Sequence, residues 1–135
     1  MKKIIYISVL VLFVNSLYAK TIRIGKLQTV KTIQQALIFA TDGDTVLVEP
    51  GHYHEKNIII NRSIFLIGID HPVLDGDKKY EIISIKANGV LIDGFKIIHS
   101  GISSIEDYAG IKIYSSRNVV VRNNILEDTF FGIYT

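Results

Sequence analysis

The sequence predicts an all-β protein, more specifically a parallel β-helix in which short strands stack rung on rung. Three observations support this fold class. Isoleucine and valine, which favour strands, are abundant. Similar strand-like segments start 26 and 29 residues apart, and each ends in a tight polar corner. One amphipathic helix near the N-terminus is placed to cap the coil.

The first nineteen residues have the layout of a secretory signal peptide. Lys2 and Lys3 give a positive start, an apolar run follows, and Ala19 offers a cleavage point. The run is short for a membrane span, and an uncleaved anchor is the alternative. We therefore expect residues 1–19 to be a signal peptide and the protein to be exported. Residues 20–135 are expected to be the N-terminal part of a β-helix domain, truncated at its C-terminal end.

Charge and cysteine content argue against several kinds of partner and site. Without Lys2 and Lys3, 13 basic residues balance 13 acidic ones. No basic stripe suggests binding to nucleic acid or to an anionic membrane surface. The chain has no cysteine, which excludes disulfides and thiolate metal sites within it. The only methionine, Met1, would leave with the signal peptide.

Residues 32–40 are predicted to form the capping helix, because apolar residues fall at i, i+3, i+4 and i+7 from Ile33. Thr32 can cap the start, and Gly43 suits a left-handed turn at the end. Residues 45–49 are predicted to be a strand. A helix in this position would cover the open end of the coil interior and block edge-to-edge pairing.

Two sets of strand-like segments recur along the rest of the chain. They are joined by short corners that contain Asn, Gly or Ser, of which Asn and Gly tolerate positive φ. An antiparallel sandwich is the alternative, but similar strand–corner–strand units at similar intervals favour the solenoid. One set comprises residues 64–68, 90–94 and 119–123, the other comprises residues 58–60, 83–85 and 111–113, and residues 132–134 look like the start of another round.

Residues 32–37, 43–48 and 50–55 resemble the opening of right-handed parallel β-helix proteins of the pectin lyase type. Pectin methylesterases share a similar pattern, T-I-Q-x-A, then G-D-x-V-x-V, then P-G-x-Y-x-E. The resemblance implies the fold and not the function. Within this pattern, Tyr53 is expected to pack its ring over a rung. Glu55 is expected to bind a backbone N–H or a basic side chain.

Later motifs look like consecutive motifs of NosD-like proteins, and the resemblance covers essentially the whole mature segment. It implies a periplasmic accessory protein that works with an ABC transporter. That protein would help to assemble the copper centre of nitrous oxide reductase, and copper is the metal that the resemblance implies. The motifs are residues 72–76, 94–97, 100–102, 107–111 and 126–134, and the last of them, L-E-D-T-F-F-G-I-Y, is the most specific.

The histidines are the candidate metal ligands for such a role. If residues 52–55 are extended, His52 and His54 point to the same face and together could hold a metal ion. The sequence places no third ligand, since His71 lies in a turn and His99 just after a strand. The sequence therefore favours two solvated turn histidines. Replacing both is expected to leave copper handling unchanged, with the ligands lying elsewhere.

A carbohydrate-binding or polysaccharide-modifying protein is the alternative function, and a purely structural or interaction solenoid is a third. An enzyme of this fold would need carboxylates on the outer face of one sheet. The outward positions of the second strand set should be Ile59, Ser84 and Lys112, none of which is acidic. We therefore expect no catalytic residue in this segment and no enzymatic activity. Asp75 and Asp93 are expected to serve turns.

Overall fold

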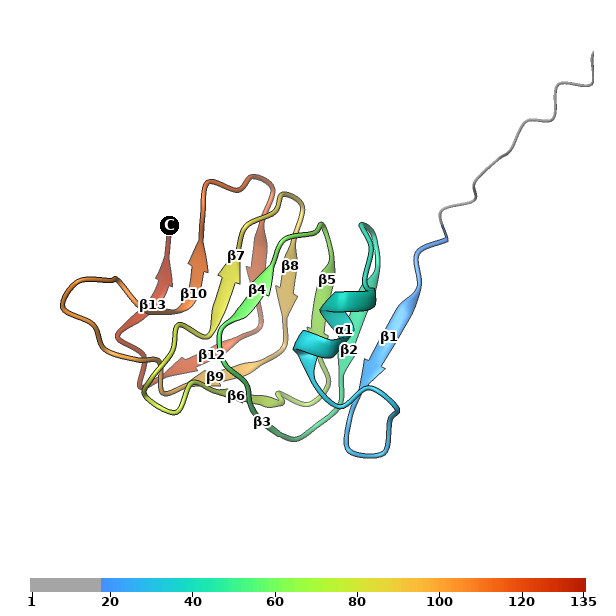
Figure 1. Cartoon of the computed structure of the whole chain (residues 1–135), viewed down its shortest axis with the longest axis horizontal. Coiled ribbons are helices and arrows are strands. Elements are labelled where there is room, and N and C mark those ends of the chain that lie inside the picture. The colour runs from blue at the N-terminus through green and yellow to red at the C-terminus, as the bar shows by residue number, and fades with distance from the viewer. Residues whose placement is uncertain (1–17) are drawn as a thin grey trace, which may run out of the picture.

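The computed structural model describes residues 18–135 as three parallel sheets wound into one coil (Figure 1). From β2 onward the chain passes through sheets A, B and C in turn, and each strand pairs in parallel with its equivalent one round later. This is a right-handed parallel β-helix, the hand expected for parallel crossover connections. The parallel pairing confirms the predicted fold and excludes the antiparallel sandwich.

The strands are short, from three to five residues. Sheet A contains β1 (Thr21–Ile24), β2 (Thr45–Val48), β5 (Phe65–Gly68), β8 (Leu91–Asp93) and β11 (Val120–Arg122). Sheet B contains β3 (His52–His54), β6 (Val73–Asp75), β9 (Lys96–Ile98) and β12 (Ile125–Glu127). Sheet C contains β4 (Ile58–Ile60), β7 (Ile83–Ile85), β10 (Ala109–Ile113) and β13 (Phe131–Tyr134).

Helix α1 (Ile33–Phe39) covers the N-terminal end of the coil, as predicted (Figure 1). The Thr32 hydroxyl accepts a hydrogen bond from the Gln35 N–H at 3.1 Å, so Thr32 is the N-cap. Ile33 and Ala36 are buried against the first rungs. Gly43 has a φ of 89°, which confirms the left-handed turn after the helix.

Apolar side chains from all three sheets stack in lines inside the coil, with two such lines in sheets A and C and one in sheet B. In sheet C, Ile58, Ile83 and Ile111 pair in register, and at most 1% of each is exposed. Burial of one such side chain stabilises the fold by roughly 1.5–3 kcal/mol. Because equivalent residues stack on one another, every rung buries the apolar face of its neighbour. The line in sheet B is Tyr53, Leu74, Ile97 and Leu126.

Sheet B and strand β1 were not predicted as such from the sequence. Each strand of sheet B is three residues long and contributes a single inward residue, which is too short a pattern to show a period of two.

The predicted signal peptide lies almost entirely outside the described residues. Within those residues, no helix is long and apolar enough to cross a membrane.

A candidate metal site on the outer face of sheet B

The two histidines of β3 lie on the outer face of sheet B, on either side of the inward Tyr53. Their imidazole rings are stacked, with centroids 4.4 Å apart and planes 11° from parallel. About half of each side chain is exposed. The extended backbone and the shared face agree with the sequence prediction for His52 and His54.

Asp75 joins the two histidines from the next rung. The β3–β6 register pairs His54 with Asp75, and the Asp75 Oδ2 atom lies 2.9 Å from His52 Nε2. Three donor atoms, one each from His52, His54 and Asp75, all lie within 4.8 Å of one another. The structure therefore supplies the third potential ligand that the sequence did not place. Asp75 also serves the expected turn, since its Oδ1 accepts a hydrogen bond from the Asp77 N–H at 2.9 Å.

The Asp75 carboxylate is held in its ionised form although it is almost buried, with 7% of the side chain exposed. Burial raises the pKa of Asp75. Hydrogen bonds from the Asp77 backbone and from the rings of His52 and His99 outweigh that effect and lower the pKa below its usual value. A carboxylate that stays charged in this position can neutralise part of a bound cation's charge.

A second layer of polar contacts orients these groups. Asp77 Oδ1 lies 2.7 Å from His54 Nδ1, and His99 Nδ1 lies 3.0 Å from Asp75 Oδ1. Asp77 and His99 both follow strands of sheet B in left-handed backbone conformations, with φ of 53° and 56°. That conformation is uncommon for residues other than glycine, and here both residues contact the cluster. A carboxylate that holds one imidazole nitrogen leaves the other nitrogen free for a metal.

The donor set is suited to a borderline transition metal. Imidazole nitrogens bind copper and zinc well, and a carboxylate oxygen completes such sites. Three protein donors leave a coordination position open, as sites that exchange a ligand require. The exposed histidines would let a cation enter from solvent. His71 lies apart in an exposed turn with a φ of 53° and is not one of the three clustered donors.

The sequence contained one signal that could have located Asp75. H-Y-H at residues 52–54 and V-L-D at residues 73–75 are equivalent strands one round apart. Aligning the two strands at their central apolar residues, Tyr53 and Leu74, would place Asp75 beside His54. Asp75-Gly76 also has a sufficient explanation as a turn, which hides this signal.

The structural roles expected of Tyr53 and Glu55 are confirmed. The Tyr53 ring packs at the end of the sheet B interior line, and its hydroxyl donates to the Glu49 carbonyl at 2.8 Å. The Glu55 carboxylate accepts from the backbone N–H groups of Ile33 and Gln34 at 2.7 and 2.9 Å. Glu55 thus satisfies free donors at the start of α1 and ties the capping helix to the coil.

The outer face of sheet C contains a carboxylate, which lies outside its strands. Ile59, Ser84 and Lys112 do occupy neighbouring register positions, but a carboxylate is also present there. Glu81, from the turn before β7, accepts hydrogen bonds from Ser84 and from the Tyr114 hydroxyl, and its Oε2 lies 3.8 Å from Lys112 Nζ. The three outward strand positions carry no acidic residue, as predicted, and this carboxylate comes from a turn instead. Glu81 is 4% exposed, so the carboxylate braces neighbouring rungs.

The stacked rungs, the three parallel sheets and the capping helix define a parallel β-helix repeat protein. In sequence, the chain is similar to a cell surface glycoprotein of Methanothermus fervidus, with 32% identity over 113 residues. The similarity covers 79% of this chain and 18% of that protein. No family model matches the chain, and no solved structure matches it. The specific resemblance to NosD-like proteins stays a prediction.

Proposed function

We propose that this chain belongs to an exported accessory protein that holds a copper ion on sheet B and passes it to a partner. The observation that carries the proposal is the convergence of His52, His54 and Asp75 on one outer face. The name of the similar protein, a cell surface glycoprotein, supports a location outside the cytoplasm. The resemblance to NosD-like proteins adds a periplasmic location, nitrous oxide reductase as the recipient and an ABC transporter as a partner.

Copper is favoured among the first-row metals on chemical grounds. A given nitrogen and oxygen site binds Cu²⁺ more tightly than its neighbours in the series, including Zn²⁺. His52 Nε2 and Asp75 Oδ2 are 2.9 Å apart, and a metal would take the place of the proton that they share. The bound ion is cargo in this proposal, so an open coordination position and exposed ligands are useful for its transfer.

The test is Cu²⁺ binding by the chain, measured by competition with a chromophoric chelator. The sequence alone favoured no loss of copper handling on replacing both histidines, but Asp75 adds a third donor to them. We therefore expect the double variant His52→Ala/His54→Ala and the single variant Asp75→Asn each to lose at least roughly tenfold in affinity. His71→Ala is the matched control, because His71 is an exposed histidine outside the cluster. The electron paramagnetic resonance spectrum of the Cu²⁺ complex should show nitrogen coupling that disappears in the double variant.

Unchanged affinity in the double variant would overturn the metal site, since both histidines are half exposed and their loss should leave the fold intact. Melting temperatures of all variants separate a lost ligand from a lost fold. The delivery role needs a separate experiment in the source organism. Formation of a complete nitrous oxide reductase copper centre in a deletion strain would refute delivery while leaving metal binding in place.

A further inference from the structure

The corner between β4 and β5 contains an asparagine that has no part in the metal site. Asn61, Arg62 and Ser63 form the tripeptide N-x-S with x other than proline, which is the acceptor sequence for N-linked glycosylation. Among the asparagines of the whole sequence, only Asn61 is followed two positions later by serine or threonine. The acceptor sequence acts only where the asparagine is accessible, so the surroundings of Asn61 decide its value.

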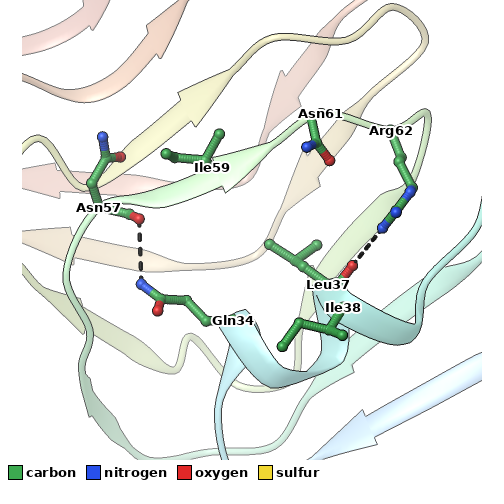
Figure 2. Close-up of a pocket in the computed structure, with 7 residues that line it drawn as sticks. All are labelled: Gln34, Leu37, Ile38, Asn57, Ile59, Asn61 and Arg62. Atoms are coloured by element: carbon green, nitrogen blue, oxygen red, sulfur yellow. Dashed lines mark hydrogen bonds between the residues drawn. The ribbon is translucent and has the colours of Figure 1, made fainter.

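Asn61 lies on the surface, at the first position after β4. Its side chain is exposed and makes no hydrogen bond with any residue between 18 and 135. Figure 2 shows the amide directed from the corner into the space beside α1, where no hydrogen bond reaches it. That space has a volume of about 460 Å³ and opens to solvent. A sugar joined to Asn61 Nδ2 therefore has room without movement of the backbone.

The neighbouring rung holds Ser63, which supplies the hydroxyl of the acceptor sequence. Ser63 Oγ donates to the Gly89 carbonyl at 3.2 Å, and the Ser63 N–H donates to Asp42 Oδ1 at 2.8 Å. In the folded protein this hydroxyl is therefore engaged, whereas the acceptor sequence requires it at this position. Gly89 lies 26 residues further along the chain, so Ser63 is free until the next rung has packed.

We propose that Asn61 is N-glycosylated during export, before the rung that contains Gly89 packs against the corner. The exposed asparagine gives the glycan room in the finished coil, and the engaged serine places the reaction before folding is complete. The inference rests on export, which is one part of the proposed function. It does not rest on copper, because the three clustered donors on sheet B do not include Asn61.

The reaction needs a sugar donor and a transferase outside the cytoplasm. The donor is a lipid-linked oligosaccharide whose first sugar is joined to a phosphate group. A bond forms between Asn61 Nδ2 and the anomeric carbon of that sugar, and the bond from the same carbon to the phosphate oxygen breaks. Nδ2 gives up one proton and the lipid phosphate leaves with the bonding electron pair. Nothing is oxidised or reduced.

The test of the site is mass spectrometry of the protein isolated from its source cells. We expect an oligosaccharide mass on Asn61 and none on Asn57, which lies on the same side of α1 but has Ile59 two positions later. Asn61→Gln and Ser63→Ala should each remove the added mass, whereas Ser63→Thr keeps a hydroxyl and should retain it. Asn61→Gln should also keep the melting temperature of the parent, because it breaks no side-chain hydrogen bond within residues 18–135.

The timing is tested by offering a purified transferase and its lipid-linked donor to unmodified protein. Folded parent is compared with Ile83→Asp, which places a charge at a fully buried position of the coil interior and prevents packing. We expect the unfolded variant to be modified at least roughly tenfold faster, because Ser63 is released only when the next rung opens. Equal rates overturn the assigned timing.

The remaining outcomes separate this inference from the proposed function. An exported protein with an unmodified Asn61 overturns glycosylation and leaves the copper site in place. A protein found only in the cytoplasm overturns the export part of the proposed function, and glycosylation with it. Added mass that survives in Asn61→Gln shows that the assigned residue is wrong. Cu²⁺ affinity is measured separately and decides nothing about Asn61.

Discussion

Removal of the Tyr53 ring tests how the first rung is held. Tyr53 is the first residue of the interior line of sheet B, followed by Leu74, which is 1% exposed. Its ring also lies against Gly51, where an added Cβ would sit 3.1 Å from Tyr53 Cε2. The ring therefore fills the space between the helix-capped end of the coil and the following rung.

The size of the effect follows from two separable contributions. Tyr53→Phe keeps the ring and removes only the hydrogen bond to the Glu49 carbonyl, so we expect a loss of about 1 kcal/mol in the free energy of unfolding. Replacing a fully buried aromatic residue by alanine costs about 3–5 kcal/mol. Tyr53 is only partly buried. We therefore expect Tyr53→Ala to cost about 2–4 kcal/mol, the hydrogen bond included.

The assay is urea unfolding followed by far-ultraviolet circular dichroism at neutral pH. Phe39→Ala is the matched control, because Phe39 is an aromatic residue on α1 with 61% of its surface exposed. Its loss should change stability by about 0.5 kcal/mol or less. Equal stability of Tyr53→Ala and the parent would refute the packing role. A Tyr53→Phe variant as unstable as Tyr53→Ala would show that the hydrogen bond, and not the ring, holds the rung.

Two further predictions concern carboxylates that bind backbone N–H groups. Glu55→Gln should lower stability by about 1 kcal/mol in urea unfolding. Each carboxylate oxygen of Glu55 accepts from one N–H at the start of α1, and glutamine offers only one acceptor oxygen. Glu106→Gln, at an exposed residue, should leave stability unchanged. Hydrogen bonds from the Lys20 and Thr41 backbones lower the pKa of Asp44 to about 2 from 3.8. A carboxyl group with a lowered folded-state pKa contributes its stability above the unfolded-state pKa. That contribution is lost as pH falls from about 4 to about 2. Asp44→Asn should be less stable than the parent at neutral pH and should lose less stability over this pH window. Identical pH profiles for the two proteins would contradict the assignment.

Local patterns made most of the fold predictable. The helix, its Thr32 cap and the Gly43 turn depend on interactions within a few residues, and all three are present. The strands of sheets A and C carried enough apolar residues to show their repeat. The strands of sheet B did not, because each has three residues and one inward side chain. The positions of Tyr53 and Glu55 could be assigned from the resemblance to other β-helices.

The sequence by itself determined a coil of stacked parallel strands. Residues two apart in a strand share a face of the sheet, and equivalent residues one round apart stack on that same face. It also determined that His52 and His54 point the same way. Only the tertiary structure decided what lies beside them. The number of residues in each corner sets the register between rungs, and that register brings Asp75 against His54 and His99 against Asp75. Alignment of the two equivalent strands could have placed Asp75 beside His54, but the contact of His99 with Asp75 depends on corner geometry, which is decided by backbone packing across rounds.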